Sequence, residues 1–164
     1  MIMTYEIKDC VLTEAYTAVV RGEMPVAELP AWMMGAFGAV HDYLRRSGVA
    51  PTGAPFARIA MLDGTVAAEA GFPVGREIAG DDLVEPSMLP EGHAVTLTHM
   101  GPYEEVERAY EAAHRWLDSH GYEPAGPHWE VYYTDPTAEP DPTRWRTDVV
   151  VPYRVGQGGV SRSA

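Results

Sequence analysis

The sequence has few of the residues that build redox or membrane-spanning structures. A single cysteine, Cys10, excludes an internal disulfide and any metal site made of several thiolates. The longest run without a charged residue, Leu29 to Val40, is shorter than the ~20 apolar residues that a membrane-spanning helix needs. The N-terminus shows no basic segment followed by an apolar run, so we see no secretory signal and expect a cytoplasmic location.

Basic residues are also scarce. The chain has 12 Lys and Arg against 24 Asp and Glu, which gives a formal net charge of −12. This charge would repel a phosphate backbone, and no basic stripe offsets it, so we predict no direct binding of nucleic acid. The acidity fits either a role in solubility or an attraction for cationic ligands.

Familiar catalytic and metal-binding motifs are missing as well. The six histidines show no H-E-x-x-H spacing, and there is no Gly-rich phosphate loop, G-x-S-x-G turn or Cys/His nucleophile pair. We therefore predict no metal site and no cofactor. Any catalysis would depend on Glu130 as a general base for water, or on Tyr103 and His99 as proton donors.

Apolar periodicity and turn residues predict a mixed fold. Strands are expected over 3–7 and 11–21, and a helix follows with an apolar stripe from Leu29 to Leu44 and Gly48 just past its end. Gly35 and Gly38 lie inside this helix, where we expect close packing against another backbone. Asp63-Gly64 predicts a tight hairpin between strands at 56–62 and 65–74.

The second half shows the same order of elements. A polar connection over 75–92, with one short strand near Leu83-Val84, leads to a strand at 93–100 and a second helix that stops at Gly121. Strands are then expected at 127–134 and 147–151, the latter closed by Pro152, and the tail from Gly156 is expected to be disordered.

The two halves align as an internal repeat. Gly48 and Gly121 are 73 positions apart, and the same offset aligns Phe56-Ala57 with Trp129-Glu130. Residues 72–74 align with residues 151–153 at an offset of 79. We predict an α+β fold in which a tandem β-α-β-β repeat forms one antiparallel sheet with two helices and a groove between the pseudo-twofold halves. The expected boundaries are one domain over 1–155, with repeats at about 3–75 and 93–153 joined by a connection at about 76–92, and a tail at 156–164.

The strand around Glu130 is the most unusual stretch. Because strand side chains alternate, His128, Glu130 and Tyr132 should share one face, and Trp129, Val131 and Tyr133 the other. A carboxylate among aromatic rings is either tied by an arginine or by backbone N–H groups, or is open to a ligand.

Three motifs together resemble the GyrI-like small-molecule-binding family, also called the AraC-type effector-binding domain. They are His99-Met100-Gly101-Pro102-Tyr103, Trp129-Glu130-Val131-Tyr132, and the terminal strand Thr147 to Pro152. The resemblance covers about residues 5–153. It implies a ligand groove between the repeats and a glutamate in that groove, which corresponds to Glu130 here; its counterpart in the first half is Ala57. The absence of a DNA-reading module before Met1 suggests the stand-alone format of the family.

Three functions agree with this resemblance. The first is multidrug-type binding of hydrophobic, often cationic or planar small molecules, with Glu130 as polar anchor. The others are hydrolysis of cyclopropane-containing alkylating natural products for detoxification, with Glu130 activating water and Tyr103 assisting, and inhibition of a protein such as DNA gyrase. The expected ligand-binding residues are Glu130, Tyr132, Phe56, Tyr103 and Trp145, the last as a lid. For Phe56 and Trp129, burial in the core is an open alternative.

Overall fold

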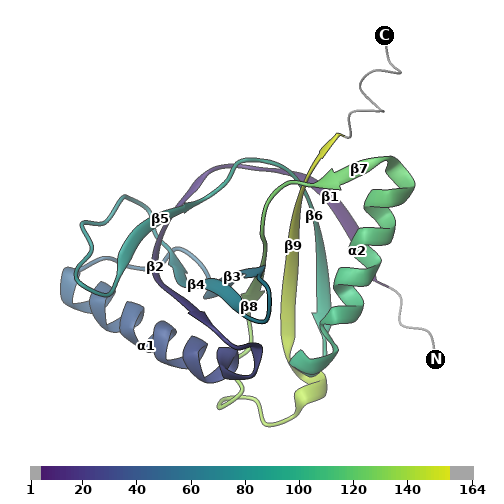
Figure 1. Cartoon of the computed structure of the whole chain (residues 1–164). Helices are drawn as coiled ribbons and strands as arrows, with labels where there is room; N and C mark the ends of the chain where they lie inside the picture. Colours follow the sequence, from purple (N-terminus) through teal and green to yellow (C-terminus); the bar gives the residue numbers. More distant parts are fainter. Residues whose placement is uncertain (1–4, 156–164) are drawn as a thin grey trace. The chain divides into compact units, whose positions relative to one another are not determined.

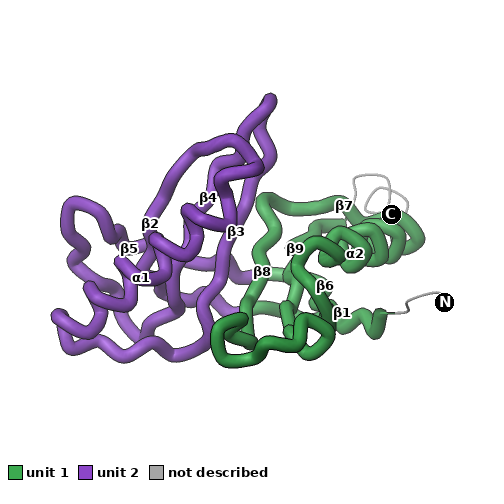
Figure 2. The backbone as a smooth tube through the Cα atoms, turned by 90° about the horizontal axis from the view of Figure 1, so that it is seen from below, with its two compact units in different colours: residues 1–12, 92–164 green, residues 13–91 purple. Residues whose placement is uncertain are grey.

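The computed structural model describes residues 5–155, which divide into two compact units. Unit 2 is continuous and spans residues 13–91, whereas unit 1 combines residues 1–12 with residues 92–164 (Figure 2). The boundaries of the units therefore differ from those of the predicted repeats, because the first strand belongs to the same unit as the second half of the chain. No helix among the described residues is long and apolar enough to cross a membrane.

Unit 2 pairs one helix with four antiparallel strands. The strand order is β3 (Phe56–Met61), β4 (Val66–Pro73), β2 (Ala15–Met24) and β5 (Glu85–Leu89). A short 3-10 turn, η1 (Val26–Glu28), leads into α1 (Leu29–Ser47) (Figure 1). The buried residues of α1 follow the predicted stripe; they are Ala36, Val40, Tyr43 and Leu44.

Unit 1 repeats this plan. The strand order is β1 (Ile7–Leu12), β6 (Gly92–Met100), β9 (Arg146–Val155) and β8 (His128–Tyr132), with the short β7 (Tyr122–Pro124) also paired to β9. The 3-10 turns are η2 (Tyr103–Glu105) and η3 (Pro142–Arg144), and the helix is α2 (Glu107–His120). Ala109, Ala113 and Leu117, four residues apart on α2, pack on Val95 and Leu97 of β6 and on Val149, Val151 and Tyr153 of β9.

The predicted α+β class and the tandem β-α-β-β order are confirmed. Gly48 and Gly121 end the two helices in the same left-handed conformation, with φ of 70° and 71°. Ala57 pairs with Ala70, and Glu130 pairs with Val149. These partners reproduce the offsets of 73 and 79 residues that the sequence predicts.

Several local predictions need correction. The last strand does not end at Pro152 but runs to Val155, because Pro152 lies between the residues that pair with β8 and those that pair with β7. The strand expected near Leu83-Val84 begins at Glu85. The tail predicted over 156–164 lies outside the described residues.

The expectation of close packing at Gly35 and Gly38 is also wrong. Both are exposed on α1, and a Cβ added at either would meet no atom within 4 Å. The close approach occurs instead at Gly71 of β4, where an added Cβ would lie 1.8 Å from the carbonyl oxygen of Ala18.

These contacts predict opposite effects of adding a methyl group. Gly35→Ala and Gly38→Ala should each stabilise the protein by roughly 1 kcal/mol, because alanine loses less backbone entropy in a helix and nothing obstructs it. Gly71→Ala should destabilise it, since backbone atoms must move. Urea denaturation of the three variants measures the change in unfolding free energy, and a loss of stability in both helix variants would contradict the prediction.

Candidate functional site

The β8 strand presents Glu130 on the side of the unit 1 sheet that α2 covers. Glu130 pairs with Val149, which belongs to the core cluster under α2. Directly opposite residues in antiparallel strands point to the same side, so Glu130 shares this face. By alternation, His128 and Tyr132 share it too, as the sequence predicts.

Two tyrosine hydroxyls hold the Glu130 carboxylate. Tyr110, from α2, donates a hydrogen bond of 2.5 Å to Oε2, and Tyr132, from β8 itself, donates one of 2.8 Å to Oε1. Neither an arginine nor a backbone N–H group bonds this carboxylate within the described part of the chain. The half-buried charge is therefore solvated by hydroxyl dipoles and is not neutralised by a protein cation.

Both tyrosines are locked in the donor role. Burial raises the pKa of Tyr110 and of Tyr132, and the neighbouring Glu130 carboxylate raises each pKa further. The two phenols therefore stay protonated throughout the physiological pH range.

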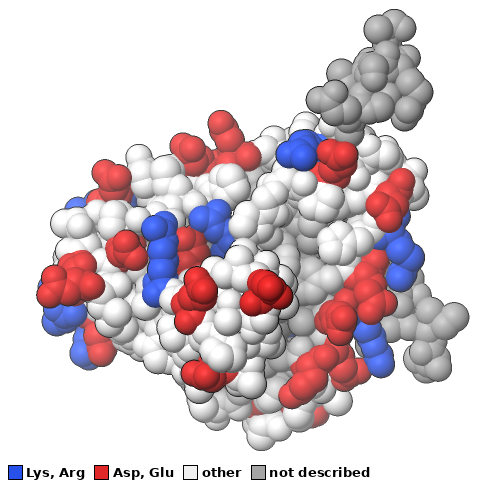
Figure 3. Space-filling model, in the orientation of Figure 1, with Lys and Arg blue, Asp and Glu red and all other residues white. Residues whose placement is uncertain are grey.

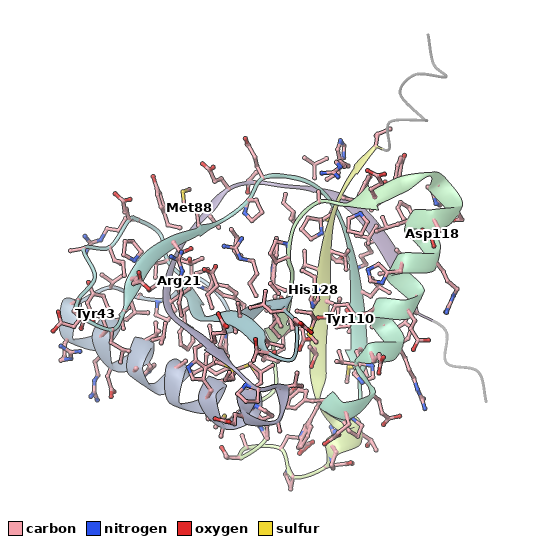
Figure 4. All side chains as sticks on the ribbon, in the orientation of Figure 1. Arg21, Tyr43, Met88, Tyr110, Asp118 and His128 are labelled. Carbon is pink, nitrogen blue, oxygen red and sulfur yellow. The ribbon has the colours of Figure 1, made fainter. Side chains whose placement is uncertain are left out.

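His128 lies beside Tyr110, one of the two hydrogen-bond donors to Glu130. Its ring centroid lies 4.3 Å from that of Tyr110, and the two side chains lie close together in Figure 4. Burial lowers the pKa of His128 to about 4, and the charge of His114 on α2 contributes in the same direction. Near neutral pH the imidazole is uncharged and does not compensate Glu130.

Three rings adjoin the site, and we call Tyr103, Tyr132 and Trp145 the aromatic cluster. Tyr103 stacks on Trp145 at a centroid distance of 5.0 Å and meets Tyr132 edge to face at 5.7 Å. The Tyr103 hydroxyl donates to the carbonyl of Thr134 at 3.1 Å, and the Trp145 Nε1 donates to the carbonyl of Glu139 at 2.7 Å. The structure thus brings together Glu130, Tyr132, Tyr103 and Trp145.

The other candidate residues, His99, Phe56 and Trp129, are buried. His99 is fully buried; its Nε2 donates to the carbonyl of Pro102 at 3.1 Å, and its Nδ1 bonds the Tyr5 hydroxyl at 2.9 Å. These bonds give it a structural role at the turn before α2. Phe56, in β3 of unit 2, is 1% exposed, and Trp129 is 4% exposed, as the core alternative predicts for each. The ligand-binding role of Phe56 stays a prediction.

Sequence reasoning missed Tyr110. Its place on an apolar helical stripe is typical of a core residue, and periodicity alone does not show that its hydroxyl reaches Glu130. The available signal was chemical, because a tyrosine in an otherwise apolar stripe needs a partner for its hydroxyl. For metals, the described residues contain no group of three or more His, Cys, Asp or Glu side chains placed to hold an ion.

Sequence comparison gives the family directly. A family model for the GyrI-like small molecule binding domain matches residues 36–154. The chain belongs to this family. No curated protein matches the sequence.

Solved structures show the same fold at low sequence identity. The EcmrR C-terminal domain superposes with a TM-score of 0.80 at 17% identity, covering 93% of this chain and 99% of that one. A hydrolase from Listeria innocua superposes with a TM-score of 0.64 at 14% identity, covering 91% of this chain and 92% of that one. SAV2435 bound to tetraphenylphosphonium superposes with a TM-score of 0.56 at 12% identity, covering 93% of this chain and 94% of that one.

The low pKa of His128 predicts a pH dependence of stability. Below the ordinary pKa of about 6.5 the unfolded chain binds a proton at this residue, whereas the folded chain does so only near pH 4. Stability should therefore fall as the pH drops through this window and level off below it. Urea denaturation between pH 7 and pH 4 should show a smaller loss for His128→Gln than for the wild type. Equal losses would contradict the assignment.

Proposed function

We propose that this chain captures hydrophobic small molecules with a cationic or planar centre at the Glu130 site of unit 1. The observation that supports this most directly is the carboxylate itself. It is half-buried, held by two hydroxyls and without a cation partner among the described residues, and it lies beside the aromatic cluster. A ligand cation would supply the missing charge, and aromatic faces would add cation–π attraction of about 0.5–2 kcal/mol per ring.

Two further findings support a cationic ligand. In Figure 3 acidic side chains lie over α2 with basic ones among them; Glu107, Glu111 and Asp118 of this helix are exposed, and so are Arg108 and Arg115. The net charge of −12 would raise the local concentration of cations around the protein. The similar SAV2435 structure holds tetraphenylphosphonium, a hydrophobic cation, and this chain belongs to a small-molecule binding family. A cytoplasmic location stays a prediction.

Tetraphenylphosphonium is a suitable probe for Glu130. Glu130→Gln should weaken its binding at least about tenfold, because the amide keeps the shape of the side chain but removes the charge. Isothermal titration calorimetry measures the change. Glu111→Gln serves as the charge-matched control, since it removes an exposed carboxylate one position from Tyr110. If the two variants bind the probe equally, the proposal is wrong.

Hydrolysis of cyclopropane-bearing alkylators is a second candidate, because Glu130 is a half-buried carboxylate without a cation partner among the described residues and could act as a general base. Glu130 would take a proton from water while the water oxygen bonds to a ring carbon. The ring C–C bond would break, and its electron pair would pass to a conjugated carbonyl of the substrate. The similar hydrolase from Listeria innocua agrees with this chemistry only at the level of fold.

Product analysis distinguishes the two candidates. A hydrolase should convert many equivalents of a cyclopropane-bearing alkylator, and Glu130→Gln should abolish this turnover while the variant remains folded. Mass spectrometry of the small molecule measures conversion. Binding without conversion by the wild type would leave capture as the function.

A further inference from the structure

Thr147 is a buried polar residue inside the site that the proposed function does not use. It is fully buried at the start of β9, and its Oγ1 has no hydrogen-bond partner among the described residues. A buried hydroxyl without a partner loses its bonds to water and gains nothing in return. Such a group calls for an explanation.

Strand register places Thr147 on the face of Glu130. In β9 it lies directly opposite Tyr132 of β8 on one side and opposite His99 of β6 on the other. Glu130 is two residues from Tyr132 and pairs with Val149, so Thr147 and Glu130 are diagonal neighbours. Diagonal neighbours in an antiparallel pair lie about 7–8 Å apart.

The polar groups around Thr147 are already engaged. Tyr132 donates its hydroxyl to Glu130, and His99 uses both ring nitrogens on Tyr5 and Pro102. The rest of the aromatic cluster is also occupied, because the Tyr103 hydroxyl and the Trp145 Nε1 donate to the backbone carbonyls of the loop between β8 and β9. Among these groups, the Thr147 hydroxyl is the one without a hydrogen-bond partner in the described structure.

We propose that the Thr147 hydroxyl is a second polar contact of the ligand site and donates a hydrogen bond to an acceptor on the ligand. This inference rests on the proposed binding function. It specifies the ligand class further as a molecule that carries both a cationic centre and a carbonyl or ether oxygen, spaced to reach two residues that lie about 7–8 Å apart. Because Thr147 is buried, the contact requires the side chains that cover it to move; Trp145, two residues before it, lies in the loop between β8 and β9.

Two matched probes test the contact. Tetraphenylphosphonium has no acceptor, whereas the same cation with a methyl ester para to phosphorus on one ring has a carbonyl oxygen at a suitable distance. Thr147→Val keeps the volume and removes the hydroxyl. It should weaken binding of the ester probe about five- to tenfold and leave binding of the parent cation unchanged. Thr147→Ser, which restores a hydroxyl, should recover affinity for the ester probe.

Thr17→Val is the matched control. Thr17, in β2 of unit 2, is also buried with an unpartnered Oγ1, so both valine variants remove the same kind of group. Neither should unfold at a lower temperature than the wild type, because replacing an unpaired hydroxyl by a methyl group removes a desolvation cost. Thr17→Val should bind both probes as the wild type does.

Three results would overturn the inference. They are equal effects of Thr147→Val on both probes, no effect on either, or a marked fall in its unfolding temperature, which would mean that the hydroxyl is bonded in the free protein. Failure of the proposed function itself looks different, because Glu130→Gln would then leave the affinity for both probes unchanged.

Discussion

The site depends on one constraint, which is that a half-buried carboxylate takes its two hydrogen bonds from two different elements. One donor belongs to the same strand as Glu130 and the other to α2. The strand fixes Tyr132 through its own backbone, but Tyr110 reaches Glu130 only if α2 packs in the right place. The packing of Ala109, Ala113 and Leu117 on the sheet therefore sets the chemistry of Glu130 as well as the stability of the unit.

The repeat carries this carboxylate in one of its two halves. Ala57, the counterpart of Glu130, is fully buried in β3 and pairs with Ala70. Unit 2 places its own buried carboxylate, Glu69, elsewhere and pairs it with Arg21 and Arg58 at 3.2 Å and 2.6 Å. The two halves share a scaffold, yet the carboxylate of unit 2 is paired with arginines, whereas that of unit 1 is hydrogen-bonded only by tyrosine hydroxyls among the described residues.

The sequence predicted the features that depend on local chemistry. The helix ends at Gly48 and Gly121, the hairpin at Asp63-Gly64 and the shared face of His128, Glu130 and Tyr132 all follow from turn preference and alternation. It did not predict contacts that depend on distant packing, such as the Tyr110 hydroxyl on Glu130 or the crowding at Gly71. The three-residue β7 was missed because so short a strand carries no periodic signal.

The division of the chain into units has a consequence for the order in which they are completed during synthesis. Unit 2 is one continuous segment, so all of its strands have been synthesised by residue 91, whereas β1 pairs with β6, which begins at Gly92. Glu130 lies in unit 1, and its strand pairs with β9, which spans Arg146–Val155. During synthesis the residues of unit 2 would therefore be complete before the strand that carries Glu130 has been made.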